Sequence, residues 1–352
     1  MEYINVRSVH RLIGANYPLG VNSLANSLER FLQQLASHGD YLPRKLLDHN
    51  LSGRRNREIS EFAHVDADFR LDLDVESGKS DLALLDYRVQ TEHARDENEK
   101  RVVFHINMKY PDKANWAIHL PLQALIKRFG DVEDGYMCYA HTVTLMDAKG
   151  IPTDGDGQVY CGITSRNWLE RMNEHFREIR SGSNKLFHRA WREFQGRSDV
   201  MLSSELVALN HTYEGAMGWE EWIVKRYMES KTSLNMIPGG FLGLKELHKL
   251  GYLNRDRDIS VTDRDKALFE YAKEHPRIGM PNLLIAGLWE DDEYYEKVIQ
   301  SRDNTLSKEQ VIQIRQLYED GHHVDNIVKD VGAINIGQVR RVIAGKTYSR
   351  MK

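Results

Sequence analysis

The first part of the chain combines helical with strand periodicity. Apolar positions recur at helical spacing after Asn22 or Ser23, either of which is a suitable N-cap, and Gly39 ends this helix. The apolar face of the helix comprises Val21, Leu24, Leu28, Phe31, Leu32 and Leu35. Alternating apolar positions around Leu71 and a β-branched, aromatic run at 102–108 then predict strands. We therefore expect an α+β region over residues 1–130, and its sequence indicates no activity.

The middle of the chain, residues 131–245, predicts a long-looped hairpin followed by helices and a third strand. Strands are expected at 136–143 and 158–163, and a loop rich in Gly and Asp joins them. Asn167 is expected to cap a helix that ends at Ser181, and Asn184 is expected to cap the next helix. A strand at 200–209 and a helix at 218–228 then lead into a turn at 235–240.

The end of the chain predicts a separate set of short helices. Residues 246–304 are charged with scattered aromatics and are expected to form a helical connecting region. In residues 305–352, Ser307 with Gln310 has the pattern of a capping box, glycines at 321 and 332 end two helices, and Asn335 caps a third. Three short helices with a tight turn before the last resemble a helix-turn-helix module.

Composition narrows the class of protein. The chain has 352 residues, of which 41% are hydrophobic and 28% are charged, which is ordinary globular composition. No apolar run approaches the roughly 20 residues that span a bilayer, and the first residues lack the apolar core of a signal peptide. With two cysteines only, we expect a soluble, cytoplasmic protein without a disulfide framework or a membrane partner.

Charge is distributed unevenly along the chain. The formal net charge of −4 excludes a globally basic nucleic-acid binder. Residues 331–352 contain five basic side chains and no acidic one, so any affinity for nucleic acid is expected from local basic faces. These basic residues are Arg340, Arg341, Lys346, Arg350 and Lys352.

Several side chains in the middle region suit phosphate chemistry. Arg171 and His175 are four residues apart, so they share one face of the predicted helix. A guanidinium on that face can hold a phosphate bidentately and neutralise charge that develops during phosphoryl transfer. Tyr139 and Tyr160 lie on the two strands of the hairpin and are expected to be neighbours across it.

The order of these residues resembles the GIY-YIG endonuclease family. The matching elements are Met137-Cys138-Tyr139, Tyr160-Cys161-Gly162, Arg171, His175, Glu220, and Asn235 shortly before Gly239-Gly240. The resemblance implies an α/β (α+β) core built on a small antiparallel three-stranded sheet flanked by helices. It also implies the hydrolysis of phosphodiester bonds in DNA with Mg²⁺ or Mn²⁺ as cofactor.

Roles for the matching residues also follow from the resemblance. Glu220 would bind the metal ion, and Arg171 would neutralise the scissile phosphate. Tyr139 would take a proton from the attacking water with help from His175, after nearby positive charge has lowered the pKa of its phenol from about 10. Tyr160 would orient the water or the phosphate. Asn235 would hold the turn or a tyrosine in place.

Three departures from the family pattern leave alternatives open. Only the tyrosine of the first motif is kept, and Tyr136 competes with Tyr139 for its role. The two tyrosines Tyr139 and Tyr160 are 21 residues apart, which exceeds the spacing common in the family and leaves an extended loop. Glu221 is adjacent to Glu220 and is the alternative metal ligand.

Basic residues outside this set are expected to contact double-stranded DNA. Lys185, His188 and Arg189 line the helix after the catalytic one and would touch the DNA backbone. In the last helix Gln338, Arg340 and Arg341 would enter the major groove, while Lys346 and Arg350 would meet phosphates.

The sequence therefore predicts a modular DNA endonuclease, most simply a site-specific homing or mobile-element enzyme. A restriction-type enzyme of the same family is one alternative. A DNA-binding regulator with an inactive nuclease core is another, which the altered first motif keeps open. The sequence leaves the oligomeric state open between monomer and homodimer.

Overall fold

The computed structural model describes residues 1–51, 67–85, 102–132, 134–153, 157–254, 260–275, 292–300 and 304–351. The chain divides into two compact units, Met1–Pro281 and Asn282–Lys352. Among the described residues, no helix has the length and apolar character needed to cross a membrane.

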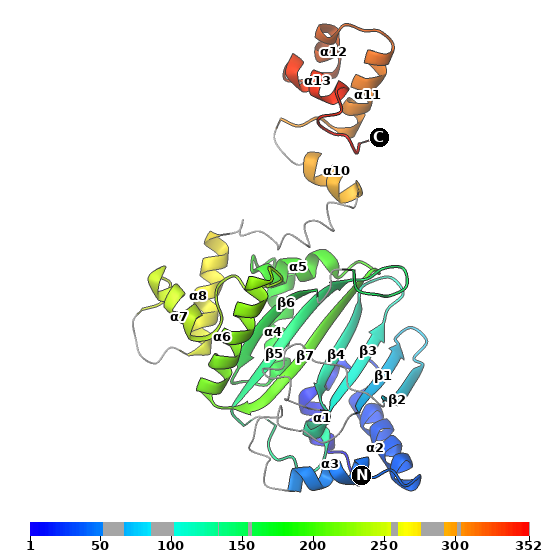
Figure 1. Cartoon of the computed structure of the whole chain (residues 1–352), viewed down its shortest axis with the longest axis vertical. Coiled ribbons are helices and arrows are strands. Elements are labelled where there is room, and N and C mark those ends of the chain that lie inside the picture. Colours follow the sequence, from blue (N-terminus) through cyan, green and yellow to red (C-terminus); the bar gives the residue numbers. More distant parts are fainter. Residues whose placement is uncertain are drawn as a thin grey trace. The chain divides into compact units, whose positions relative to one another are not determined.

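The first unit is built on one seven-stranded mixed sheet (Figure 1). The strand order is β2-β1-β3-β4-β7-β5-β6, in which β1 pairs with β3 and β4 pairs with β7 in parallel while the other neighbours are antiparallel. The strands are β1 Asp68–Asp74, β2 Ser80–Leu85, β3 Val103–Lys109, β4 Asn115–Pro121, β5 Tyr136–Leu145, β6 Gln158–Thr164 and β7 Val200–His211.

The α+β class is confirmed, but the prediction of a small three-stranded sheet is wrong. The three expected strands exist as the antiparallel set β7-β5-β6, and they form one end of the larger sheet. The reason is the parallel pairing of β4 with β7, in which Ile118 lies opposite Ser204. Because of this pairing, the sheet runs across the boundary predicted at residues 130 and 131.

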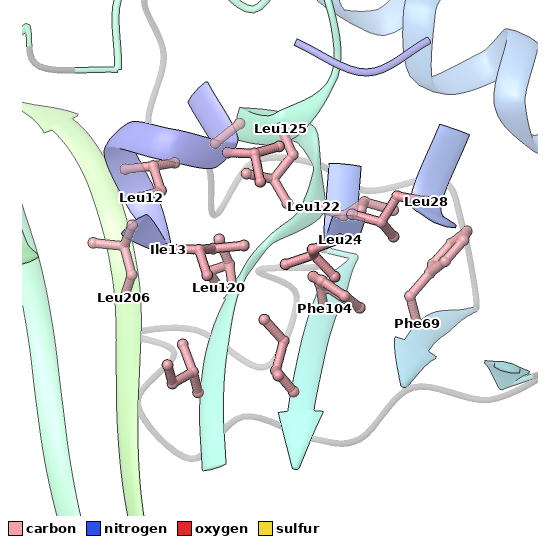
Figure 2. Packing of buried hydrophobic residues seen from close by; sticks show 14 of the residues in the cluster. Leu12, Ile13, Leu24, Leu28, Phe69, Phe104, Leu120, Leu122, Leu125 and Leu206 are labelled. Carbon is pink, nitrogen blue, oxygen red and sulfur yellow. The ribbon is translucent and has the colours of Figure 1, made fainter. Parts of the chain in front are cut away.

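Helices from the N-terminal segment cover one face of the sheet. They are α1 Val6–Leu12, α2 Val21–Ser37 and α3 Leu42–Leu51, with short 3-10 turns at Gly14–Asn16 and Leu122–Leu125. Figure 2 shows Leu24 and Leu28 of α2 near Phe69 and Phe104, with Leu120 and Leu206 on neighbouring strands. The helix expected here exists, but it begins at Val21 after Gly20, whose φ of 90° an L side chain rarely adopts, and not after Asn22 or Ser23.

Further helices pack on both sides of β5 and β6. Trp168 and Met172 of α4 (Trp168–Arg180) share the core of the N-terminal helices, while α5 (Leu186–Phe194) packs against α4. The opposite face carries α6 (Tyr213–Glu229), which packs on Cys138, Ala140 and Cys161. The remaining helices of this unit are α7 (Gly240–Lys249) and α8 (Val261–Glu274).

The predicted helix starts in this region are correct in one case and displaced in two. The side chain of Asn167 accepts a hydrogen bond from the Leu169 amide, as predicted for an N-cap. The predicted cap Asn184 is wrong by one residue, because the extended residue before α5 is Lys185, which makes no capping hydrogen bond through its side chain. The helix predicted from residue 218 begins earlier, at Tyr213, where Thr212 caps it.

The free edge of β6 is covered by the chain that follows α6. The Val159 amide donates to the Thr232 carbonyl at 2.8 Å, and the Leu234 amide donates to the Val159 carbonyl at 2.7 Å. The strand edge therefore has hydrogen-bond partners, and the turn at 235–240 is brought beside Tyr160 and Cys161.

The second unit contains α10 (Asp292–Gln300), α11 (Lys308–Glu319), α12 (Val324–Val331) and α13 (Ile336–Ile343). The predicted capping box between Ser307 and Gln310 is confirmed, and so is the cap at Asn335. Gly332 ends α12 in the left-handed conformation. The core of the unit includes Val311, Ile314, Ile327, Val339 and Val342.

Candidate functional site

A buried cluster of aromatic rings and histidines lies on the face of β5 and β6 that α4 and α5 cover. Tyr139 and His141 come from β5, Tyr160 from β6, His175 from α4 and Phe187 from α5. The Phe187 ring stacks on His141 and on Tyr160, with ring centroids 4.9 Å and 4.8 Å apart. This packing excludes water from most of the cluster, so electrostatic interactions inside it are strengthened.

Hydrogen bonds join Tyr139 to two histidines in one chain. The Tyr139 hydroxyl lies 3.0 Å from His175 Nε2, and His175 Nδ1 lies 2.8 Å from Nε2 of His188. His188 Nδ1 lies 2.9 Å from the Ser183 hydroxyl. Two assignments of protons satisfy all three contacts: in one, Tyr139 donates to His175, His175 to His188 and His188 to Ser183, and in the other every donor and acceptor is exchanged. The chain is therefore able to move a proton away from Tyr139.

Burial sets the protonation states in this chain. Desolvation raises the pKa of Tyr139 to about 12, although the positive charge of Arg171 acts in the opposite direction. Desolvation also lowers the pKa of His175 and of His188 well below the usual value, and Arg171 adds to both shifts. Tyr139 is thus a neutral phenol near pH 7 and His175 a neutral acceptor. The lowered phenol pKa that the resemblance requires is not found in this state of the site.

Gly162 explains why the second motif needs glycine after its tyrosine. Gly162 lies directly opposite Tyr139 across the β5–β6 pair. A Cβ atom at Gly162 would lie 2.6 Å from the Tyr139 hydroxyl oxygen and 2.7 Å from the adjacent ring carbon. The missing side chain therefore makes room for the Tyr139 ring beside His175.

Gly162→Ala is expected to move Tyr139 away from His175, because strand backbone and ring cannot both stay in place. We expect a loss of about 1–3 kcal/mol in the free energy of unfolding, the usual range for an overpacked core. Chemical denaturation measures this loss. Gly196→Ala is the matched control, since nothing lies within 4 Å of a Cβ atom at Gly196. Equal stability of the two variants would contradict this role for Gly162.

Arg171 is held at the centre of an acidic group. Its guanidinium contacts Glu174 at 2.9 Å and Asp265 at 3.1 Å, and a further oxygen of Glu178 lies at 3.8 Å. The side chain of Arg171 is 4% exposed, so these pairs are largely shielded from water. Arg171 also contributes to the pKa shifts of Tyr139, His175 and His188, as expected for a charge beside the hydrogen-bonded chain.

Glu220 of α6 is also buried and fully engaged. Arg264 of α8 pairs with both carboxylate oxygens, with its Nη2 atom 3.1 Å from Oε1 and its Nη1 atom bonded to Oε2. The Gly240 amide donates to Oε2 at 2.8 Å. Glu221 faces elsewhere and accepts a hydrogen bond from the Leu242 amide at the start of α7. Of the two candidate carboxylates, Glu220 is the one that lines the pocket beside Tyr160.

Asn235 fixes the turn to the strand that carries Tyr160. Its side-chain oxygen accepts from the Cys161 amide at 3.0 Å, and its amide nitrogen donates to the Cys161 carbonyl at 2.8 Å. The two bonds extend the pairing along the edge of β6 by one residue. Of the two roles predicted for Asn235, holding the turn or holding a tyrosine, these two bonds match the first.

A pocket opens beside these groups at the edge of the sheet. Its polar lining comes from Tyr160 on β6, Lys185 and His188 at the start of α5, Glu220 on α6, Asn235 in the turn, and Arg264 and Asp265 on α8. Within the described ranges, no three His, Cys, Asp or Glu side chains are arranged to hold a metal ion. Besides Asp265, Glu220 is the one carboxylate in the described lining of the pocket. Arg264 and the Gly240 amide engage both of its oxygens, so a Mg²⁺ ion would bind Glu220 only in place of Arg264.

Of the three DNA contacts expected on and before α5, the one at His188 is wrong, and those at Lys185 and Arg189 stay predictions. His188 is fully buried and belongs to the hydrogen-bonded chain, so it does not reach the DNA backbone. The Lys185 amine is paired with Glu178 at 2.7 Å. Arg189 is half-buried. The sequence analysis placed His188 on the exposed face of the helix because histidine is polar. The residue type alone does not show whether a histidine is exposed or is buried with hydrogen-bond partners.

The second unit offers basic residues on part of the expected surface. Arg340, Arg341 and Lys346 are exposed at the end of α13 and just after it. The groove contact predicted for Gln338 is wrong, because this side chain is 7% exposed and bonds the Ile334 amide and the Asn304 carbonyl. Arg350 is paired with Asp292 at 2.6 Å and lies over the Tyr295 ring.

Four residues of the site are absent from the sequence prediction. His141 and Ser183 complete the ring cluster and the hydrogen-bonded chain. Arg264 and Asp265 reach the site from α8, in a region expected only to connect modules. The sequence signal for α8 is the capping pattern at Ser260 and Asp263. This pattern predicts where a helix begins, but it does not predict which part of the protein the helix packs against.

Comparison of the chain with protein-family models, curated proteins and solved structures finds no match.

Proposed function

We propose that the protein is a metal-dependent DNA endonuclease that hydrolyses phosphodiester bonds. The observation that carries the proposal is the meeting of residues from four separate segments around one buried place. The hairpin, α4, α6 and the turn before α7 contribute Tyr139, Tyr160, Arg171, His175, Glu220 and Asn235. Such an assembly of phenol, imidazole, guanidinium and carboxylate groups supports phosphoryl chemistry more directly than any member does alone.

The proposed hydrolysis uses the chain of hydrogen bonds from Tyr139. The water oxygen forms a bond to phosphorus, and the bond between phosphorus and the leaving oxygen breaks. The proton of the water goes to the Tyr139 oxygen while the proton of Tyr139 passes to His175 Nε2, and solvent protonates the leaving oxygen. His175 in turn gives its Nδ1 proton to His188. Both histidines are neutral and each has a ring nitrogen that accepts a proton, although the desolvation that lowers their pKa opposes a lasting positive charge on either ring.

Charge around the phosphate is balanced by two further residues. The guanidinium of Arg171 would hold the non-bridging oxygens of the phosphate bidentately. The Glu220 carboxylate would hold one divalent ion, Mg²⁺ or Mn²⁺, whose charge polarises the phosphate. Tyr160 lines the same pocket and would orient the substrate through its hydroxyl group.

The second unit supports site-specific binding to double-stranded DNA. Its three short helices end in the exposed basic residues Arg340, Arg341 and Lys346. A binding unit separate from the nuclease core favours a homing or mobile-element enzyme over a restriction-type enzyme, because long sites are read through separate modules.

Cleavage of supercoiled plasmid and phage genomic DNA tests the proposed function. We expect discrete cuts with Mg²⁺, none with a chelator, and a loss of about 10²-fold or more in Glu220→Gln, since one group that stabilises transition-state charge contributes that much. The matched control is Glu221→Gln, which changes the adjacent carboxylate outside the pocket and should cut as the wild type does. End sequencing then gives the site and the strands cut.

A second candidate function is a DNA-binding regulator with an inactive core. The observation that favours it is the pairing of Glu220 with Arg264, which leaves no oxygen of that carboxylate for a metal ion. Tight DNA binding without cleavage, in Mg²⁺ and in chelator alike, would establish the regulator and contradict the nuclease.

A further inference from the structure

Helix α8 reaches the site with two consecutive residues of opposite charge. A capping box between Ser260 and Asp263 fixes the start of the helix, and Arg264 and Asp265 follow directly after Asp263. Arg264 is 7% exposed, although its neighbours Asp263 and Lys266 face solvent. The start of α8 is thus directed at the site by its charged side chains.

Arg264 occupies the position where a cation would bind. The two terminal nitrogens of its guanidinium donate to both carboxylate oxygens of Glu220. The Gly240 amide donates a further hydrogen bond to one of these oxygens, Oε2. The positive charge of Arg264 compensates the buried carboxylate, as a divalent ion would. A metal ion therefore reaches Glu220 only by displacing the guanidinium.

Asp265 occupies the position where an anion would bind. Its carboxylate lies 3.1 Å from the Arg171 guanidinium, on the nitrogen that Glu174 does not contact. With Asp265 in place, negative charges surround Arg171, and a phosphate approaching it meets repulsion. The same phosphate takes over the contact if Asp265 withdraws.

The apolar contacts of α8 lie beyond its first turn, at Ala267 and further along the helix to the buried Ala272. Ala267 packs against Ile237 and Leu247, with Leu268 and Tyr271 at the margin of this group. Phe269 on the same helix is 41% exposed. The position of the start of α8 therefore depends chiefly on the pairs with Glu220 and Arg171.

We propose that α8 is an autoinhibitory element whose Arg264 and Asp265 stand in for the divalent cation and the DNA phosphate. This inference rests on the proposed function, because it identifies what the two residues replace. Since Arg264 and Asp265 lie in one helical turn, a ligand that displaces one of them also weakens the ion pair that the other forms with the site. Metal ion and DNA backbone consequently bind with positive cooperativity, and each raises the affinity of the other by the same factor.

Hydrogen exchange on the full chain tests displacement without relying on cleavage. Amides of α8 are followed in the free protein, with Ca²⁺ alone, with plasmid DNA alone, and with both. We expect exchange in α8 to rise about tenfold or more with both ligands and to change little with either one, in proportion to the population of the displaced state. Unchanged or slower exchange with both ligands would overturn the proposal.

Variants of α8 test the same point through metal affinity. In the double variant Arg264→Gln/Asp265→Asn, we expect the Mg²⁺ concentration for half-saturation to fall about tenfold. The reason is that the wild-type population in which Arg264 is paired with Glu220 does not bind the ion, and the variant lacks this pair. Titration calorimetry measures the concentration. Lys266→Gln, an exposed change on the same helix, should match the wild type. Equal Mg²⁺ affinity in all three proteins would mean that α8 is only a structural support.

The two proposals fail in different ways. If the double variant binds Mg²⁺ more tightly and α8 is displaced by ligands, but no protein cuts DNA, then α8 competes with these ligands and the nuclease is wrong. If the wild type cuts as fast as the double variant at limiting Mg²⁺, the nuclease holds and autoinhibition is wrong. Should the double variant fail to fold, exchange in the wild type decides alone.

Discussion

Arg171→Ala is expected to lower the free energy of unfolding of the first unit by about 3–5 kcal/mol, the usual cost of removing one partner from a buried ion pair. The guanidinium lies among Glu174, Glu178 and Asp265, and its side chain is only 4% exposed. Without it, these carboxylates repel one another in surroundings from which water is largely excluded. Urea unfolding of wild type and variant measures the difference.

Two further variants separate charge, geometry and helix propensity. Arg177→Ala changes an exposed arginine of the same helix, so we expect a change within about 0.5 kcal/mol. Arg171→Lys keeps the charge but loses the fork that reaches Glu174 and Asp265 together, and it should be intermediate in stability. If Arg171→Ala were as stable as Arg177→Ala, the acidic group would not depend on this guanidinium.

Short-range signals predict much of the local structure. The cap at Asn167 and the capping box at Ser307 depend on contacts within three residues, which the sequence displays directly. The hairpin strands and α4 follow from alternation and helical spacing in the same way. The N-cap position before α5 depends on backbone conformation, which the residue types do not display. The prediction of Asn184 therefore missed the observed position, Lys185, by one residue.

Long-range pairing is what the sequence did not predict. The seven-stranded sheet exists because β4 pairs with β7, two strands separated by the whole hairpin and two helices. A strand looks alike in sequence whether its neighbour is near or distant along the chain, so the extent of the sheet stayed hidden. The same limit explains why α8 was expected only to connect modules.

For the site, the sequence predicts the chemical groups better than their environments. The resemblance selects Tyr139, Arg171, His175 and Glu220, and they do lie around one place. It does not reveal that burial raises the pKa of Tyr139 to about 12 or that Arg264 covers Glu220. Those properties depend on which segments pack over the site, and packing is not encoded within any one motif.

The stability of the first unit is expected to fall as the pH drops below about 6.5, because three buried histidines are neutral in the folded protein. Desolvation lowers the pKa of His141 to about 3 and lowers the pKa of His175 and of His188 well below the usual value. The unfolded chain therefore binds protons that the folded chain does not. The stabilisation is complete above the pKa of histidine in the unfolded chain, and it is lost as the pH falls toward the lower pKa values of the folded protein. The loss reaches up to about 1.4 kcal/mol per pH unit for each histidine, or about 4 kcal/mol per pH unit for all three.

His141→Phe isolates one share of this effect. Phenylalanine keeps the stacking on Phe187, and His141 Nε2 has no hydrogen-bond partner within the described part of the chain. The contact between His141 Nδ1 and Ser204 is lost, which lowers stability equally at every pH and leaves the slope as the readout. Urea unfolding between pH 7 and 5, followed by tryptophan fluorescence, should give an average slope smaller by about 1 kcal/mol per pH unit in the variant. The control His38→Gln removes an exposed histidine and should keep the wild-type slope. If His141→Phe also kept that slope, the pKa of His141 would be the same in the folded and the unfolded chain, and the desolvation of this ring in the cluster would be wrong.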